Sequence, residues 1–357
     1  MTLKVAVLGA SGFIGNRTVE KLHLEAKAEV LPVVRSFGSL ARLARFDLDC
    51  RIADALDQRA LRTAFAGCEL VVHAVVGNPD VILGSAEATY TAAQAAGVRR
   101  LVYLSTASVH GQAPVPGTNE TSSLSSRQPL GYNNAKVLAE RKLLQLRAKG
   151  SVELVMLRPG IVFGPRSRWI AGLANDLLAG RAYLVNGGEG ICNSIYVDNL
   201  VHAIELAMMG VDADGHAFLV GDREKVTWRD FYRFLVEALP VDFDVPCIPC
   251  PEFKSTWKDH LTGVRSSRPV QDVLPFFPAK LKQVVKGAIS AWSQLPAASG
   301  WALSTTSSPV VTQEMALLHM CSYKFPNYKA EKILGYEPIV SFEEACHRSI
   351  SWLAFAG

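Results

Sequence analysis

Short apolar runs alternate with helical segments through the first half of the chain. The runs are rich in Val, Leu and Ile and too short for helices, as expected of strands that are buried on both faces. They lie at residues 5–8, 30–34, 70–76 and 101–105, and helices are predicted at residues 16–26, 85–96 and 132–146. This order predicts an α/β fold in which helices cover both faces of a doubly wound parallel sheet.

Three glycines directly follow the first apolar run, in the order Gly9-Ala-Ser-Gly12-Phe-Ile-Gly15. Gly9 permits a tight turn, Gly12 lets the backbone approach a phosphate, and Gly15 lets the next helix pack closely on the strand. A helix N-terminus attracts anions, so the pattern predicts a dinucleotide pyrophosphate in this loop and a Rossmann-type fold. The other loop residues expected at the cofactor are Ser11, Phe13 and Ile14. The alternative is a glycine turn that binds no ligand.

The second apolar run ends in Arg35, at the position where an acidic residue accepts the ribose hydroxyls of NAD. No Asp or Glu occurs in residues 30–46, whereas Arg42 and Arg45 follow Arg35. Guanidinium groups bind phosphate well, so the sequence favours NADP(H) and leaves NAD(H) possible. The alternative is that these arginines form a solvated surface after the strand.

Further cofactor contacts are expected where the next strands end. Asp54 is placed where a third strand could present a carboxylate to the adenine amino group, or where it could cap a helix over residues 58–65. Ala74 and Val75, at the end of the run at 70–76, are expected to border the same cofactor, because ligands bind at the carboxyl ends of parallel strands.

A hydroxyl-rich strand end and a Tyr-x-x-x-Lys pair supply the candidate chemistry. Thr106 follows the run at 101–105, and Tyr132 and Lys136 lie one turn apart on one face of the next helix. The Lys136 ammonium would stabilise a phenolate at Tyr132 and could also hold a ribose. Tyr132 and Thr106 would share a substrate oxygen while a hydride moves between carbon and nicotinamide. The alternative is an accidental spacing on an exposed helix.

Composition fits a cored enzyme and excludes some partners. The chain has 357 residues, of which 49% are hydrophobic, and a net charge of +4, with no basic tract suited to nucleic acid and no apolar run that could span a bilayer. The absence of a leader and the seven scattered cysteines predict a cytoplasmic location. Cys247 and Cys250 have redox or metal spacing, but no second ligand pair accompanies them, so no metal is expected.

The chain is predicted to form two domains. Residues 1–180 form an NAD(P)-binding Rossmann domain whose sheet is completed by residues 191–222. Residues 223–357 mainly form a smaller C-terminal substrate-binding domain, with an insertion at about 241–310 that is rich in Pro, Ser and Trp. Within the insertion, apolar positions from Leu281 to Trp292 predict an amphipathic helix that packs on the core, with a membrane-surface helix as the alternative.

In this order the motifs resemble the extended short-chain dehydrogenase/reductase superfamily, the group labelled NAD-dependent epimerase/dehydratase. The chain's ending also looks like that of the 3β-hydroxysteroid dehydrogenase and dihydroflavonol-reductase-like branch. The matching stretches are residues 9–15, 104–111, 132–136, 157–165, 196–199 and 328–338. The resemblance implies a catalytic triad of Thr106, Tyr132 and Lys136, and a homodimer. It also implies that Pro159, Gly160 and Val162 border the nicotinamide.

Departures from the family pattern concern the substrate. Cys192 stands where many nucleotide-sugar enzymes of the group have an Arg that binds a diphosphate, and Ile82 lies near the place of a common Asn. Arg166 and Arg168 could supply the positive charge instead. The residues expected at a small-molecule substrate are Ser108, His110, Arg166 and Cys192.

The leading interpretation is an NAD(P)-dependent oxidoreductase that interconverts a carbonyl and a secondary alcohol on a fairly apolar substrate. The first alternative is a nucleotide-sugar epimerase, dehydratase or ketoreductase. The second is a binding protein that senses the cofactor and has lost catalysis. The presence of both Tyr132 and Lys136 argues against this last interpretation.

Overall fold

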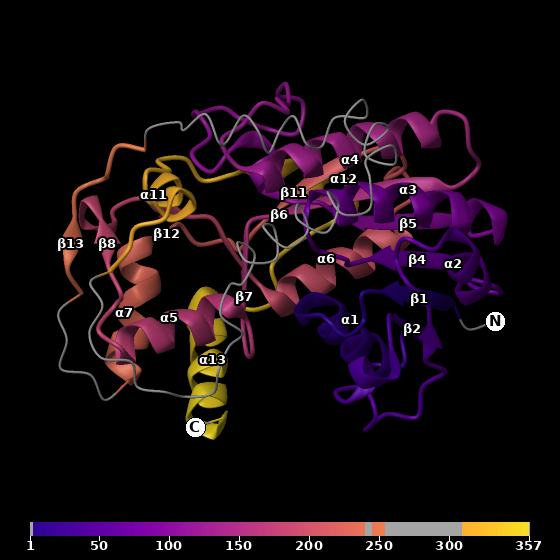
Figure 1. The fold of residues 1–357 in the computed structure, drawn as a ribbon, viewed down its shortest axis with the longest axis horizontal. Coiled ribbons are helices and arrows are strands. Elements are labelled where there is room, and N and C mark those ends of the chain that lie inside the picture. The colour runs from indigo at the N-terminus through magenta and orange to yellow at the C-terminus, as the bar shows by residue number, and fades with distance from the viewer. Residues whose placement is uncertain (1–2, 240–244, 254–308, 357) are drawn as a thin grey trace, which may run out of the picture.

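A seven-stranded parallel sheet forms the centre of the molecule (Figure 1). The computed structural model describes residues 3–239, 245–253 and 309–356. From edge to edge the strands are β11 (Ala217–Val220), β6 (Glu153–Pro159), β5 (Arg100–Leu104), β4 (Leu70–His73), β1 (Lys4–Leu8), β2 (Glu29–Val34) and β3 (Arg51–Ile52). Every neighbouring pair is parallel, so all carboxyl ends meet at one edge. The predicted doubly wound α/β fold is confirmed.

Helices cover both faces of the sheet because the strand side chains that point to each face are apolar. In β1, Val5 and Val7 join one core cluster, whereas Ala6 and Leu8 join the other. The first cluster is closed by α1 (Phe13–Leu24), α6 (Val197–Met209) and α12 (Tyr328–Leu334), and the second by α2 (Gln58–Ala64), α3 (Pro79–Ala95) and α4 (Gly131–Arg147). The sheet is therefore the middle layer of three.

A smaller C-terminal group of elements lies beside the carboxyl edge of the sheet, at the left in Figure 1. Its helices are α5 (Arg168–Leu178), α7 (Trp228–Ala238), α11 (Gln313–His319) and α13 (Phe342–Ala356). Its strand pairs are β7 (Ile161–Phe163) with β10 (Ser194–Tyr196), β9 (Ile191–Cys192) with β12 (Val226–Thr227), and β8 (Leu184–Val185) with β13 (Cys247–Ile248). A third core cluster fills this group around Trp228, which is fully buried and donates its indole N–H to the Leu318 carbonyl at 3.0 Å.

Three short 3₁₀ helices complete the described elements. They are η1 (Phe37–Leu40), η2 (Ala107–His110) and η3 (Asn186–Gly188). The helix η2 directly follows β5 and so stands at the carboxyl edge of the sheet.

Helix starts differ most from the sequence predictions. The helix α1 begins at Phe13, inside the glycine loop, because Gly12 serves as its N-cap. The helix α3 begins at Pro79 and not at residue 85, because Asn78 accepts the Val81 N–H and proline suits the first helical position. Asp57 caps α2 by accepting the N–H groups of the second and third helical residues, so the alternative that Asp54 caps this helix is wrong.

The predicted insertion falls mostly on residues that are not described. Residues 254–308, with the amphipathic helix predicted from Leu281 to Trp292, lie outside the described part of the chain. Cys247 lies in the short strand β13, and Cys250 follows it on the surface.

None of the helices in the described ranges combines the length and the apolar character needed to cross a bilayer.

The substitution Gly15→Ala tests how closely α1 must approach β1. A Cβ at this position would lie 2.3 Å from the Gly9 carbonyl oxygen, so the helix must shift outward. We expect the free energy of unfolding to fall by about 1–3 kcal/mol in urea denaturation. Gly38→Ala is the control, because an added Cβ there meets nothing within 4 Å. Equal stability of the two variants would contradict this account.

Candidate active site

A cleft of about 330 Å³ opens at the carboxyl edge of the sheet, where β1, β2, β3 and β4 end. It lies at the point where the strand order reverses, the usual place for a ligand in such sheets. The predicted cofactor residues that line it are Gly9, Ser11, Gly12, Arg35, Asp54, Ala74 and Val75. The structure thus brings residues from four strand ends into one cleft.

The glycine loop has the shape that a pyrophosphate needs. Gly9 has a φ of +85°, and a Cβ there would lie 2.8 Å from the Ala74 carbonyl oxygen. Gly12 caps α1 without a side-chain hydrogen bond, so the N–H groups of the first turn, at Phe13 and Ile14, can bind an anion. The loop therefore fits the dinucleotide that its sequence predicts.

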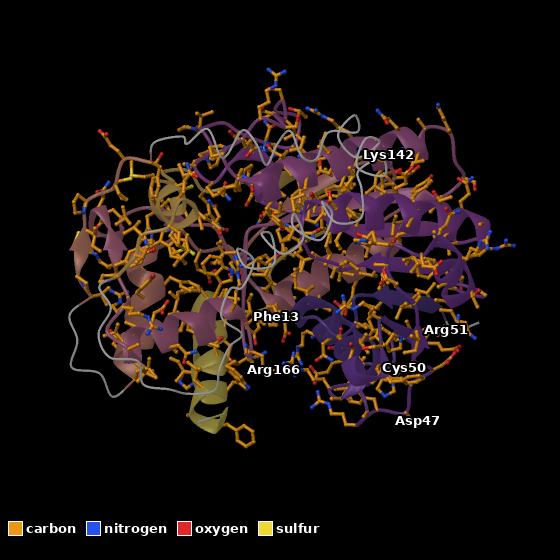
Figure 2. All side chains as sticks on the ribbon, in the orientation of Figure 1. Phe13, Asp47, Cys50, Arg51, Lys142 and Arg166 are labelled. Carbon is orange, nitrogen blue, oxygen red and sulfur yellow. The ribbon has the colours of Figure 1, made fainter. Side chains whose placement is uncertain are left out.

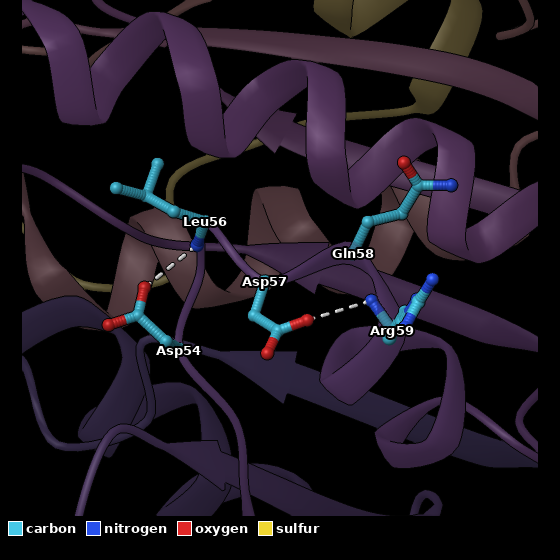
Figure 3. Close-up of a pocket in the computed structure, with 5 residues that line it drawn as sticks. All are labelled: Asp54, Leu56, Asp57, Gln58 and Arg59. Atoms are coloured by element: carbon cyan, nitrogen blue, oxygen red, sulfur yellow. Dashed lines mark hydrogen bonds between the residues drawn. The ribbon is translucent and has the colours of Figure 1, made fainter.

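Arg35 and Asp54 lie farther along the same cleft. Arg35 is exposed and shares the cleft with Ser39. Asp54 accepts the Leu56 N–H at 2.8 Å and also lines an adjoining hollow of about 620 Å³ (Figure 3). These positions suit contacts with the adenosine half of a dinucleotide.

Thr106 and Tyr132 form the hydroxyl pair of the site. The Thr106 hydroxyl accepts the Ser108 N–H at 3.2 Å, so its own proton can be donated to another oxygen. Burial raises the pKa of the Tyr132 phenol above its usual value, although a hydrogen bond with Thr106 acts in the opposite direction. The phenol is therefore protonated at neutral pH.

Lys136 lies under this pair and is only 2% exposed. Its Nζ donates to the Leu104 carbonyl at 2.7 Å and to the Tyr103 hydroxyl at 3.4 Å. Burial lowers the pKa of Lys136 to about 8, while the Glu140 carboxylate raises it. The predicted Thr106, Tyr132 and Lys136 thus meet where β5 ends and α4 begins.

Two buried charged residues beside this group were not predicted from the sequence. Glu140 accepts the Arg158 guanidinium at 3.0 and 2.7 Å and the Ser105 hydroxyl at 2.5 Å. Arg158 also reaches His110, with 3.1 Å between Nη1 and Nε2. Helical spacing could have revealed Glu140, because it lies one turn beyond Lys136 on the same face of α4.

Ser108 and His110 lie on η2, directly after Thr106. The His110 ring packs on Phe325 with 5.9 Å between ring centroids. Burial and the Arg158 charge lower the pKa of His110 to about 4, so its ring is neutral at physiological pH. A neutral imidazole has one donor and one acceptor nitrogen, and because the Arg158 guanidinium can only donate to Nε2, Nδ1–H of His110 is the donor.

The predicted nicotinamide residues Pro159, Gly160 and Val162 lie where β6 passes into β7. Gly160 is required there, because a Cβ would lie 2.0 Å from the Asn193 carbonyl oxygen. Gly160 and Ala107 also line one small cavity. Gly160 thus lies on the same cavity as the residue that follows Thr106.

The Arg166 side chain is directed toward α1. It has a φ of +71°, and its Nη2 lies 3.9 Å from a carboxylate oxygen of Glu20 on α1. Figure 2 shows Arg166 and Phe13 where the start of α1 faces the C-terminal group. Arg45 also pairs with Glu20. The guanidinium of Arg166 is therefore engaged with α1, and the predicted substrate contact gains no support from this geometry.

A second carboxylate joins α1 to the C-terminal helices. Asp198 at the start of α6 receives the Arg17 guanidinium of α1 at 2.6 and 2.8 Å. Arg348 of α13 approaches the same carboxylate at 3.6 Å. The helix that fits the pyrophosphate is therefore tied to both parts of the molecule.

Cys192 lies in the core and not on a cleft surface. The β9–β12 pairing directs its side chain into the third core cluster, where it is 1% exposed, and burial raises the pKa of the thiol well above its usual value. We therefore correct the expectation that Cys192 contacts the substrate: its position instead fills apolar space.

Within the described ranges, no group of three or more His, Cys, Asp or Glu side chains is arranged to hold a metal ion.

One family model matches most of the Rossmann part of the chain. Its description is "NAD dependent epimerase/dehydratase family", and it covers residues 5–221. This range contains the glycine loop, Thr106, Tyr132 and Lys136.

Two curated proteins are similar over nearly the whole chain. The 2-alkyl-3-oxoalkanoate reductase of Shewanella oneidensis is 24% identical, with 96% of this chain and 84% of that protein covered. The decarboxylating sterol-4-alpha-carboxylate 3-dehydrogenase of Mus musculus is 25% identical, with 97% and 90% covered. The similarity thus extends over most of the length of two oxidoreductases.

The fold is also that of a solved sugar-nucleotide enzyme. The dTDP-glucose 4,6-dehydratase DesIV of Streptomyces venezuelae, with NAD bound, superposes with a TM-score of 0.71 at 18% identity. The match covers 99% of this chain and 97% of that one. It supports the architecture alone.

The substitution Cys192→Arg tests the corrected position of Cys192. A guanidinium here would be buried among apolar side chains, so we expect the free energy of unfolding to fall by at least about 3 kcal/mol. Cys250→Arg, at an exposed cysteine, is the control and should change it little. Urea denaturation of both variants measures the difference. Wild-type stability together with tighter binding of a nucleoside diphosphate would show that position 192 reaches the cleft.

Proposed function

Because the chain belongs to the NAD dependent epimerase/dehydratase family, we propose that it is an oxidoreductase that interconverts a carbonyl and a secondary alcohol. Membership confirms the predicted family and an NAD-dependent enzyme. The observation that carries the proposal is the meeting of Thr106, Tyr132 and Lys136 at the sheet edge that also holds the glycine cleft. Tyr132 is the proposed general acid and base.

Different residues of the chain would bind the pyrophosphate and the nicotinamide of the cofactor. Gly9, Gly12 and the first turn of α1 would hold the pyrophosphate, because this helix start has no side-chain cap. Pro159 and Gly160 would border the nicotinamide. When bound, the cofactor supplies or accepts a hydride.

Tyr132 transfers the proton of the reaction, and Thr106 and Lys136 assist it. In the direction of reduction Tyr132 donates its proton to the carbonyl oxygen, while Thr106 donates a hydrogen bond to the same oxygen. The buried phenol begins protonated, because burial raises its pKa. Lys136 stabilises the phenolate that remains, and with a pKa of about 8 it carries a positive charge at neutral pH.

The proposed substrate class comes from the curated relatives. The names 2-alkyl-3-oxoalkanoate and sterol-4-alpha-carboxylate 3-dehydrogenase share one pattern: the reacting oxygen is on the carbon next to the one that bears a carboxylate. We propose an apolar 3-oxo or 3-hydroxy acid of this pattern. Conversion of a nucleotide sugar without net redox change is the alternative that the assay below distinguishes.

NADP(H) is the proposed cofactor within the NAD(P) class. Arg35 lies on the cleft at the end of β2, and Ser39 lines the same cleft. An arginine here can pair with a 2′-phosphate, whereas an acidic residue would bind the two ribose hydroxyls of NAD.

We also propose a cytoplasmic homodimer. The helices α3 and α4 pack together, and α4 exposes Leu138 and Leu144, which a second copy could cover. All seven cysteines are thiols in the structure, which suits a reducing compartment.

The substitution Tyr132→Phe tests the reaction. With a 2-alkyl-3-oxoalkanoate, the wild type should oxidise one NADPH per alcohol formed, followed by absorbance. Removing the phenol should lower kcat by about 10²–10⁴-fold and leave the Kd of the cofactor unchanged, because only the transferred proton is lost. Tyr328→Phe, at an exposed tyrosine, is the control. Near-normal turnover in the Tyr132 variant would overturn its role, and conversion of UDP-sugars with no net NADPH change would favour the epimerase alternative.

The substitution Arg35→Ala tests the cofactor preference. We expect the wild type to bind NADPH more tightly than NADH, and the variant to lose about 1.5–3 kcal/mol of that difference, as for a charge-assisted contact. Isothermal titration with both cofactors measures it. Arg59→Ala removes an equal charge from the adjoining hollow and should keep the preference. Equal dissociation constants in the wild type would refute the proposal.

A further inference from the structure

The Glu140 carboxylate connects α4 to the ends of β5 and β6 through buried hydrogen bonds. It lies on α4, one turn beyond Lys136, and is 1% exposed. Its carboxylate accepts the Ser105 hydroxyl at 2.5 Å and the Arg158 guanidinium at 3.0 and 2.7 Å. Three hydrogen bonds thus fix a buried carboxylate between α4, the end of β5 and the end of β6.

The residues held by Glu140 are chain neighbours of the reacting groups. Ser105 stands between Leu104, whose carbonyl accepts the Lys136 ammonium, and Thr106. Arg158 directly precedes Pro159 and the close backbone crossing that follows it. A shift of the carboxylate would therefore move the strand end that presents the Thr106 hydroxyl.

The surroundings of Lys136 make the charge of Glu140 important. From β5 the lysine meets the neutral Tyr103 hydroxyl and the Leu104 carbonyl. His73 of β4 is also neutral, because burial lowers its pKa to about 3.

The remaining charges near Lys136 belong to one ion pair. His110 of η2 is neutral, with a pKa lowered to about 4. Arg158 of β6 is cationic and is bound to Glu140. The phenol of Tyr132, on the same helix, is protonated at neutral pH. Among the described residues, Glu140 thus supplies the negative charge that favours the ammonium form of Lys136.

We propose that Glu140 is a positioning residue of the active site, which keeps Lys136 in its ammonium form and fixes the strand end that carries Thr106. The catalytic relevance of this role rests on the proposed function. The protonation of Lys136 can be measured without any reaction, so a failure of either proposal is recognisable by itself.

The variant Glu140→Gln removes the charge and keeps the shape. Protein labelled with ¹³C at the lysine side chain, without cofactor, is titrated by NMR, and Lys136→Arg assigns the signal. The wild-type midpoint is expected near pH 8. In Glu140→Gln it should fall by about one pH unit or more, because a nearby opposite charge is lost. An unchanged midpoint would overturn the proposal.

The same variant should change the pH profile of turnover. The descending limb of kcat/KM for oxidation of a 2-alkyl-3-hydroxyalkanoate should move to lower pH, following the loss of the Lys136 charge. Glu140→Asp restores the charge and should return the limb to near its wild-type place. Loss of activity without a shift of the limb would reduce Glu140 to a structural role and contradict the proposal.

Glu153→Gln is the matched control. Glu153 lies at the opposite end of β6 and accepts the buried Arg100 at 2.7 Å, so its loss breaks a similar pair away from the site. This variant should lose stability and keep both the Lys136 midpoint and the pH profile. An equal shift in Glu153→Gln would show that any broken pair has this effect and would refute a specific role for Glu140.

Ser105→Ala keeps the ion pair and removes only the tether to the strand end, so it should fold even if Glu140→Gln does not. We expect kcat to fall about tenfold with an unchanged Lys136 midpoint, because the hydroxyl of Thr106 is displaced. Unchanged kcat would refute the tether. A shifted midpoint would refute the assignment of the charge effect to Glu140.

Discussion

The contact between Gly15 and the Gly9 carbonyl is the constraint on which the site depends. Because neither residue carries a side chain, the first turn of α1 can lie against the end of β1 and across from Ala74. This closeness puts the start of α1 beside Gly12, which lines the cleft where β1 and β4 end. It also fixes where Arg17 meets Asp198 of α6, the carboxylate that Arg348 of the C-terminal group approaches.

The parts of the fold with strong local patterns could be predicted from the sequence. The apolar runs and the glycine loop are sufficient for the parallel sheet, since each strand is buried on both faces and needs a helix to return. The predicted start of α3 was too late even though Asn78-Pro79 is a clear helix signal, because the continuous apolar run from Val81 to Leu83 shows no helical period.

The predicted residues of the candidate site fall into two classes. Thr106, Tyr132 and Lys136 could be predicted to lie close together, because their spacing on one strand end and one helix face is a local property. The direction of Cys192 and Arg166 was not local: Cys192 turns inward through the pairing of β9 with β12, and Arg166 follows a carboxylate on α1. The spacing of residues along the sequence does not indicate either contact.

Burial shifts the pKa values of the two titrating groups of the site in opposite directions. It stabilises the neutral phenol of Tyr132 and the neutral amine of Lys136, so a dry pocket alone would leave the pair without charge. The Glu140 carboxylate changes that balance for the lysine, at the cost of a second buried charge that needs Arg158 as its partner. The Glu140–Arg158 ion pair thus helps to determine the charge of Lys136 in the site.

Asp198 gives the molecule a particular order of assembly during its synthesis. Arg17 leaves the ribosome 181 residues before its carboxylate partner, which is roughly 10–40 s at ordinary translation rates. Throughout that interval α1 lacks the contact that joins it to α6. Arg348, which also approaches Asp198, is translated later still. The side-chain link between α1 and α6 can therefore form only after Asp198 has been translated, whereas the packing of α1 on β1 and β2 needs only the start of the chain.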